Sequence, residues 1–366
     1  MKDKILWLVK DSPTEIGSAG LVRLYRLLKY LSSLNKYDIT VFSMSANYGM
    51  KPMEALGIKV NFKQDMAELI KEVMYKDKFQ VCITSWWYIA SAYIPLIKSI
   101  DPDINIIIDT VDIEWIRNRR ASSFVKIDPS YIVEREIQEK SIYKTNNNFL
   151  FVTNEDRNSF LNELNQKINS EIVSLPYYEK NNVPKKDMEQ IYFIGFFNHA
   201  PNIHGAIRTC EIFKEILKIK PNLKLRIIGK YPPSEVKKYH DDKNIFVTGI
   251  DYKLESTLNL MSVALLPIYY GGGVNGKILE AMNNGIPVVT DEFGAKCIPE
   301  AKNGTNIMIA KNEKELCGYT IKLLTDNQLY SSVSQNALSL INKHFKYEYI
   351  GNKLDAFLFK ICNPLI

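Results

Sequence analysis

Short apolar segments bounded by turn residues alternate along the chain with longer segments whose apolar residues recur at helical spacing. This alternation is typical of parallel sheets covered by helices on both faces. Gly20–Leu34 illustrates the helical segments, because its leucines form one apolar stripe that we expect to face a core. In the first half of the chain the predicted strands are Ile5–Val9, Ile39–Ser43, Ile58–Phe62, Gln80–Thr84, Ile104–Asp109, Asn148–Thr153 and Ile172–Leu175.

The second half of the chain repeats this pattern after a polar segment without periodicity, Tyr178–Glu189, which we interpret as a linker. Its predicted strands are Ile191–Ile194, Lys224–Ile228, Ile245–Thr248, Val263–Leu266 and Val288–Thr290. Its predicted helices are Ile203–Lys218, Leu254–Met261, Val274–Asn284 and Lys314–Leu324. The sequence therefore predicts an α/β protein with two doubly wound Rossmann-like domains and ligands at the carboxyl ends of the strands, in the crevice between the domains.

Length and composition agree with two domains and narrow the functional classes. The chain has 366 residues, of which 46% are hydrophobic, enough for two separate cores. A formal net charge of +6 is too small to indicate a nucleic-acid-binding protein. The five cysteines are scattered without CxxC spacing, which favours reduced thiols in a cytoplasmic protein over disulfides or zinc.

Three further segments exclude common alternatives. Met1–Pro13 lacks the apolar core of a signal peptide, so we expect it to contain the first strand. Val81–Ile97, the longest uncharged segment, contains a proline and is shorter than the ~20 apolar residues that cross a membrane. The first turn, Asp11–Gly20, lacks the GxGxxG fingerprint and no P-loop motif occurs, which disfavours NAD-dependent enzymes and P-loop NTPases.

A glycine run between a buried strand and a helix carries the strongest chemical signal. The strand is expected to end at Pro267, Gly271–Gly273 follow, and the helix is expected to begin at Val274. Without Cβ atoms, peptide N–H groups can approach an anion closely, and a helix N-terminus adds partial positive charge. Lys277 and Glu280 follow on one side of the helix, where a cation and a ribose-binding carboxylate suit a nucleoside diphosphate. A glycine-rich turn before an ordinary surface helix is the alternative.

The segment Gly271–Ile298 resembles the donor-binding signature of the retaining family-4 glycosyltransferases with the GT-B fold. Other stretches resemble the same family in the same order, namely Ile16–Gly20 with Arg23, Ile108–Arg120, Ile191–Ala206, Leu225–Lys230 and Val247–Asp251. The resemblance covers essentially the whole chain. It implies an N-terminal domain at residues 1–178 on the acceptor side, a linker at 179–188 and a C-terminal nucleotide-sugar-binding domain at 189–345. It also implies that residues 346–366 form a helix returning to the N-terminal domain, and that the two domains face each other across a cleft.

The resemblance also implies which residues bind the donor. Backbone amides around the glycines would hold the phosphates or the sugar, Glu280 would bind the ribose, and the turn Ile250–Tyr252 would line the base. The implied donor-binding set is Gly17, Asn198, Asn202, Lys230, Gly272, Gly273, Val274, Lys277 and Glu280.

Three positions depart from the commonest form of the family. Gly272 stands where many relatives have a glutamate that touches the transferred sugar, Phe196 stands where an arginine is frequent, and Val111 replaces a histidine. Neutralisation of the diphosphate would then depend on Lys277, on Lys230 or on a group that the sequence does not identify.

The polar residues that follow the predicted strand Ile104–Asp109 of the first domain are the candidates for catalysis of sugar transfer and for acceptor binding. Asp112 would face the acceptor hydroxyl or stabilise positive charge on the sugar ring. Alternatively, Asp112 is the N-cap of a helix over Ile113–Arg120, and both interpretations stay open. Arg117 and Arg120 are candidates for binding an acidic or phosphate-linked acceptor, with a solvated basic helix face as the alternative.

The function implied by the resemblance is a retaining, metal-independent transfer of a sugar from a nucleotide-sugar substrate to a glycan, lipid-linked or protein-linked acceptor. Such a reaction belongs to surface polysaccharide or glycoconjugate synthesis. We expect no cofactor, since the nucleotide sugar is a substrate, and no metal, because neither His199 nor His204 has a second His or Cys at ligand spacing. We expect a cytoplasmic protein without a nucleic-acid partner. Peripheral contact with the inner face of the membrane is a further possibility, because acceptors in such families are often lipid-linked. A catalytically idle homologue that acts as a partner subunit and a nucleotide-sugar epimerase are the alternatives.

Overall fold

The computed structural model describes residues 2–45, 50–63, 65–181 and 186–363. The chain divides into two compact units. The first comprises Met1–Pro176, Gly272–Val274 and Tyr347–Ile366, and the second comprises Tyr177–Gly271 and Asn275–Lys346. Of the predicted linker, residues 182–185 lie outside the described residues.

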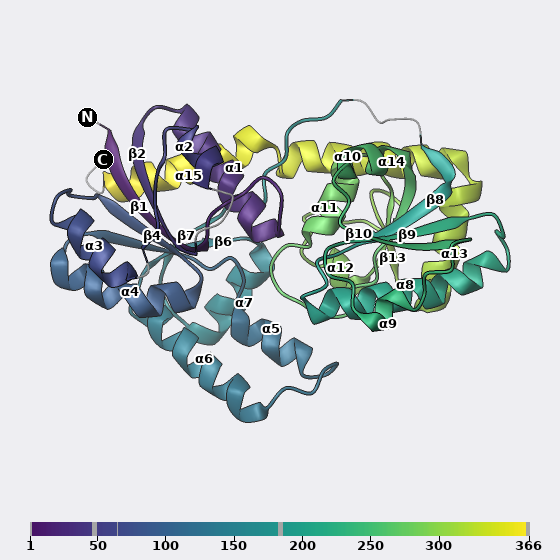
Figure 1. Ribbon diagram of the computed structural model, residues 1–366, viewed down its shortest axis with the longest axis horizontal. Coiled ribbons are helices and arrows are strands. Elements are labelled where there is room, and N and C mark those ends of the chain that lie inside the picture. Colours follow the sequence, from purple (N-terminus) through teal and green to yellow (C-terminus); the bar gives the residue numbers. More distant parts are fainter. Residues whose placement is uncertain (1, 46–49, 64, 182–185, 364–366) are drawn as a thin grey trace. The chain divides into compact units, whose positions relative to one another are not determined.

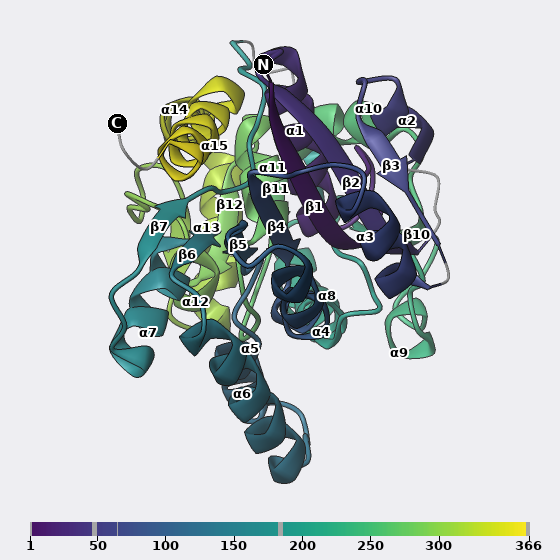
Figure 2. The ribbon, with the colours of Figure 1, turned by 90° about the vertical axis from the view of Figure 1, so that its left-hand side faces the viewer.

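Within the described residues, the first unit contains a seven-stranded sheet with the order β3-β2-β1-β4-β5-β6-β7; Figure 1 labels β1, β2, β4, β6 and β7, and Figure 2 also labels β3 and β5. Its strands are β1 (Asp3–Asp11), β2 (Tyr37–Ser45), β3 (Lys59–Asn61), β4 (Val81–Ser85), β5 (Asn105–Asp109), β6 (Asn148–Phe151) and β7 (Asn169–Ile172). Neighbouring strands are parallel. The strand order reverses between β1 and β4, which is where doubly wound sheets bind ligands.

Helices cover both faces of the first sheet, because successive side chains of a strand point to opposite faces. Along β1, Leu6 and Leu8 enter a core built with α3, α4, α6 and α7. Ile5, Trp7 and Val9 enter a second core built with α1, α2 and α15. The helices of this unit are α1 (Ala19–Ser33), α2 (Met50–Glu54), α3 (Met66–Met74), α4 (Trp87–Ile100), α5 (Glu114–Ala121), α6 (Pro129–Lys144), α7 (Asn154–Leu164) and α15 (Tyr347–Cys362).

The C-terminal helix α15 belongs to the core of the first unit although it follows the second unit in sequence. The Tyr30 hydroxyl donates a 2.6 Å hydrogen bond to the side-chain oxygen of Asn352. A Cβ atom at Gly351 would lie only 2.3 Å from Cγ of the Tyr30 ring, so only glycine fits where α15 crosses α1.

As far as the chain is described, the second unit contains a six-stranded parallel sheet with the order β10-β9-β8-β11-β12-β13. Its strands are β8 (Asp187–Ile194), β9 (Lys224–Ile228), β10 (Ile245–Gly249), β11 (Met261–Leu265), β12 (Val288–Asp291) and β13 (Met308–Ala310). Its helices are α8 (Ala200–Leu217), α9 (Ser234–Lys237), α10 (Leu254–Leu260), α11 (Gly276–Asn283), α12 (Glu292–Ala295), α13 (Glu313–Thr325) and α14 (Asn327–His344). The strand order reverses between β8 and β11. The predicted pair of doubly wound parallel sheets is thus confirmed.

Several element boundaries differ from the sequence prediction, among them the start of β8 at Asp187 in place of Ile191 and the start of α8 at Ala200 in place of Ile203. Strand β7 begins at Asn169, three residues before the predicted run Ile172–Leu175, because its pairing with β6 starts there. The helix predicted from Val274 begins at Gly276, so Val274 lies in the preceding loop. Strand β13 has only three residues and was not predicted, since so short an apolar run gives no measurable period. Over the described residues, no helix combines the length and apolarity that a membrane span needs.

Candidate functional site

The second unit brings two predicted donor-site residues together at the reversal of its strand order. Lys277, in the first turn of α11, donates a hydrogen bond from Nζ to the side-chain oxygen of Asn202 in α8. The Asn202 amide nitrogen in turn donates to the Phe196 carbonyl at 2.8 Å. The sequence separation of Lys277 and Asn202 is 75 residues, and the sheet topology closes it because β8 and β11 are neighbours. Asn198 is exposed in the loop before α8.

Lys277 lies in surroundings that disfavour its charge. Its ammonium is 5.2 Å from the centre of the Phe193 ring, and its side chain is only partly exposed. Burial lowers the pKa of Lys277 to about 8, while the carboxylate of Asp291 acts in the opposite direction. An anion that binds beside a lysine in such surroundings stabilises its charged form.

Asp291 was missed by the sequence analysis. It ends β12, caps α12 by accepting from Gly294 N at 2.9 Å, and also accepts from the backbone amide of Ile268 after β11. Burial raises the pKa of this carboxyl. Asp291 directly follows the predicted strand Val288–Thr290, and this position could have marked it as a candidate. By accepting from the Ile268 amide, Asp291 fixes the loop that leads to the glycine run.

The remaining donor-site candidates of the second unit lie on separate elements. Glu280 is partly exposed on α11, and one of its carboxylate oxygens accepts a 3.0 Å hydrogen bond from Asn284. Lys230 follows β9, is exposed, and places its ammonium 4.7 Å from the centre of the Tyr231 ring. The structure joins neither side chain to the Lys277–Asn202 pair by a hydrogen bond among the described residues.

The glycine run lies beside Asp112 and Arg117 within the first unit, to which Gly272–Val274 belong. Gly273 has a φ of +63°, which disfavours any residue with a side chain, and a Cβ there would lie 3.1 Å from the Val111 carbonyl oxygen. A Cβ at Gly272 would lie 3.3 Å from an Asp112 carboxylate oxygen and from Cβ of Arg117. The glycines therefore permit a close backbone approach to the candidate catalytic residue.

Asp109 and Asp112 have different environments although both follow the same apolar run. Asp109 is fully buried and accepts from both terminal nitrogens of Arg23, at 2.9 and 3.0 Å, and from the Ser85 hydroxyl at 2.9 Å. Asp109 is thus a structural anchor. Asp112 keeps 18% of its side chain exposed and forms an ion pair with Arg117.

The interpretation of Asp112 as a helix cap is wrong. Helix α5 begins at Glu114, its N-cap residue is Ile113, and no cap side chain accepts a hydrogen bond there. The backbone between β5 and α5 explains the shift, because Val111 has a φ of +58° and the Asp112 amide donates back to the Thr110 carbonyl at 2.6 Å. This tight turn directs the Asp112 side chain to Arg117 instead of the helix amides.

The arginines of α5 form ion pairs, but Arg117 and Arg119 keep 37% and 48% of their side chains exposed, so the alternative of a solvated helix face stays open. Arg117 pairs with Asp112 and lies 3.5 Å from Glu114, and the Asp112 charge raises the pKa of Arg117. Arg120 pairs with Glu155 at 3.0 Å. Arg119 was not a candidate, and two carboxylates engage it.

Gly17 is exposed in the loop after β1, and its backbone is not in the left-handed region. A Cβ there would make only ordinary contacts, the nearest at 3.5 Å to Thr14. Packing therefore does not require glycine at this position. Across the described residues, no three His, Cys, Asp or Glu side chains are grouped as metal ligands.

Comparison with known proteins finds a family match for part of the chain and a fold match for the whole chain. Residues 189–326 match the model of the family described as glycosyl transferases group 1. A search of curated proteins finds no match. Except for Gly272–Val274, the matched residues lie in the second unit, where the Lys277–Asn202 pair also lies.

Solved structures resemble the whole chain. Sucrose-phosphate synthase from Thermosynechococcus elongatus superposes with a TM-score of 0.75 at 15% identity, covering 98% of this chain and 99% of that one. HepE from Anabaena, solved with UDP and glucose, gives 0.74 at 12% identity, covering 98% and 100%. TarM from S. aureus, solved with fondaparinux, α-GlcNAc-glycerol and UDP, gives 0.71 at 10% identity, covering 97% and 99%. At these identities the likeness shows the fold alone, which is GT-B. Together with the family match, it supports a glycosyltransferase of the group 1, GT-B type.

Proposed function

We propose that this protein transfers a sugar from a nucleotide-sugar donor to a glycan, lipid-linked or protein-linked acceptor. The observation that carries the proposal is the Lys277–Asn202 pair, because a partly buried ammonium at the reversal of the strand order suits the diphosphate of the donor. Both residues fall inside the segment that matches the group 1 glycosyltransferases.

The donor-binding roles follow from the residue chemistry and the family resemblance. Backbone amides at Gly272, Gly273 and Val274 would bind phosphate or sugar oxygens, with Lys277 supplying positive charge. Glu280 would accept hydrogen bonds from the ribose hydroxyls. Gly17, Asn198, Asn202 and Lys230 would complete the donor site. Because HepE and TarM were solved with UDP, a UDP-sugar is the first donor to test.

The proposed reaction needs no metal and retains the anomeric configuration. Negative charge develops on the leaving diphosphate, and the amides and Lys277 would stabilise it in a preorganised site. Asp112 would lie by the sugar ring or the acceptor hydroxyl, where a carboxylate stabilises developing positive charge or accepts a proton. Its ion pair with Arg117 would fix its orientation.

Arg117 and Arg120 remain the candidates for acceptor binding, but their ion pairs limit the acceptor chemistry. Each guanidinium already faces at least one carboxylate, so an anionic acceptor group would compete with Asp112 or Glu155. An acceptor carried on a lipid would bring the protein to the inner face of a cytoplasmic membrane, which flotation with vesicles containing that lipid would detect.

Incubation with a panel of UDP-sugars and candidate acceptors tests the proposal through release of UDP and formation of a glycosylated product. Acceptor-dependent release is the expected result. Conversion of the donor sugar without an acceptor would indicate the epimerase instead. A protein that binds UDP but neither transfers nor hydrolyses any donor would be the idle homologue.

Asp112→Asn tests the catalytic role. We expect turnover to fall by about 10²-fold or more, because the proposed carboxylate acts on charge that develops in the transition state, while UDP affinity stays at the wild-type value. Steady-state kinetics and calorimetry with UDP measure the two quantities. Wild-type turnover in this variant would remove Asp112 from the mechanism.

A further inference from the structure

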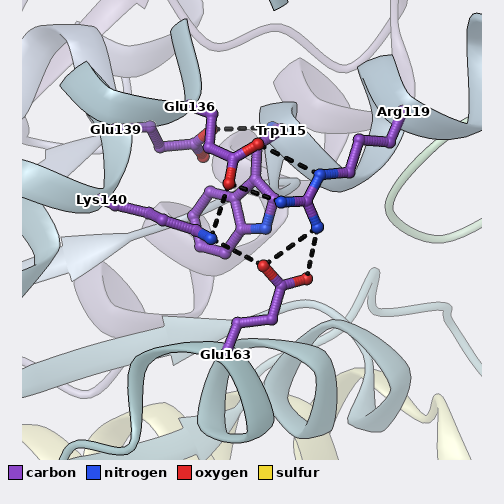
Figure 3. Close-up of polar contacts among 6 residues, drawn as sticks. All are labelled: Trp115, Arg119, Glu136, Glu139, Lys140 and Glu163. Atoms are coloured by element: carbon purple, nitrogen blue, oxygen red, sulfur yellow. Dashed lines mark hydrogen bonds and ion pairs between the residues drawn. The ribbon is translucent and has the colours of Figure 1, made fainter. Parts of the chain in front are cut away.

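One carboxylate of the first unit is fully buried and has no role in the proposed site. Glu139 of α6 is 0% exposed. Its two oxygens accept backbone hydrogen bonds from Glu114 at 3.0 Å and Trp115 at 2.9 Å, and the Tyr143 hydroxyl donates to it at 3.1 Å. Figure 3 shows Glu139 reaching Trp115 from α6. Figure 2 shows α6 running beside α5.

The two backbone amides that donate to Glu139 are the first two of α5. The first four N–H groups of a helix have no partner within the helix, and a polar side chain at the N-cap usually satisfies one of them. In α5 the N-cap is Ile113, whose apolar side chain cannot do so. Glu139, on another helix, therefore caps α5 through its two oxygens, although burial raises the pKa of its carboxyl to about 8.

Helix α5 and the turn before it hold two residues that the proposed reaction uses. Asp112 precedes the helix by two residues, and Arg117 lies within it. The turn between β5 and α5 contains Val111 at φ +58°, a costly conformation for a β-branched residue that persists only where its surroundings enforce it. Asp109 anchors the strand end of this turn through Arg23, and Glu139 anchors the helix end.

We infer that Glu139 is a positioning residue, which caps α5 and thereby holds Asp112 and Arg117 in the arrangement that sugar transfer needs. The inference rests on the proposed function. Glu139 touches neither substrate nor reacting atoms, so it acts through α5.

The same layer supplies matched controls. Glu136 of α6 and Glu163 of α7 both pair with Arg119 and with Lys140, as Figure 3 shows. Like Glu139, these carboxylates lie close to α5. Among the described residues, however, neither accepts a hydrogen bond from a backbone amide of α5. Glu136→Gln and Glu163→Gln therefore perturb ion pairs in this layer and leave the cap in place.

The experiment compares Glu139→Gln, Glu139→Asp and the two controls by transfer kinetics, UDP calorimetry and amide hydrogen exchange of the α5 segment. In Glu139→Gln one amide of α5 loses its acceptor, so we expect kcat to fall about tenfold or more, with α5 exchange accelerated and UDP affinity unchanged. Glu139→Asp keeps two acceptor oxygens and is expected to recover part of the loss. Both controls are expected to stay within about twofold of wild type.

Wild-type kcat in Glu139→Gln would overturn the inference, even with faster exchange, because the cap would then be structural only. If Glu139→Gln does not fold, Glu139→Asp is used instead. Its control is Gly351→Ala, which is expected to lower stability at a distance from α5. Equal kcat values in these two variants would also overturn the inference. Absence of transfer by the wild-type protein would refute the proposed function, whereas an active wild type with an unaffected Glu139 variant refutes only the inference.

Discussion

Burial lowers the pKa of Lys277 to about 8, which makes this residue a proton acceptor when an anion binds beside it. A diphosphate next to the ammonium favours the charged form and raises its pKa in the complex. Binding above about pH 8 therefore takes up a proton. Since the terminal phosphate of UDP itself titrates at about pH 6, UDP affinity should be constant from about pH 7 to about pH 8 and fall as the pH rises further. Calorimetry in two buffers with different ionisation enthalpies would measure the uptake.

Lys277→Arg is the control, because arginine stays protonated throughout this range. We expect weaker but pH-independent binding of UDP by this variant. If wild-type affinity does not change up to about pH 9.5, Lys277 is not beside the bound diphosphate.

A single substitution also tests the proposed role of Glu280 in ribose binding. Glu280→Ala should weaken UDP binding by roughly 1.5–3 kcal/mol, the usual range for a hydrogen bond to a charged group. Glu215→Ala is a matched control, since Glu215 is 60% exposed on α8 and pairs with Lys218 one turn away. Equal UDP affinities of the two variants by calorimetry would contradict the ribose assignment.

At the scale of elements, α15 provides a test of how the first unit is held together. Gly351→Ala places a Cβ against the Tyr30 ring, and we expect a loss of about 1–3 kcal/mol in unfolding free energy from overpacking. Gly318 lies in helix α13, where a Cβ would meet open space, so Gly318→Ala should stabilise by about 0.4–1 kcal/mol. Denaturant titrations compare the two. Similar effects from both substitutions would mean that α15 does not pack on Tyr30 in solution.

The elements also show where sequence prediction succeeded. Strand β9 and helix α1 agree with their predicted segments within a residue, because each has strong periodicity and clear turn residues at its ends. Helix α11 begins two residues late, because Gly271–Val274 form a loop whose close approach to Val111 depends on tertiary contacts. The cap of α5 could not be predicted, since its acceptor lies 25 residues further along the chain.

At the scale of the whole molecule, chelation tests the proposal of metal-independent transfer. Treatment with EDTA should leave the transfer rate unchanged, because amides and Lys277 would neutralise the leaving group. The transfer assay, repeated with and without added Mg²⁺ and Mn²⁺, checks this. Loss of activity on chelation that Mg²⁺ or Mn²⁺ restores would refute the proposal of metal independence.

The sequence alone determined the two doubly wound sheets, because periodicity and turn residues are local properties of a chain, and its resemblance to a known family supplied the candidate donor residues. Tertiary structure decided which candidates meet. It joined Lys277 to Asn202 and separated buried Asp109 from partly exposed Asp112. It also placed Glu139 on the amides of α5. These pairings depend on strand order and helix packing, which bring together residues that are far apart in sequence and that no local pattern connects.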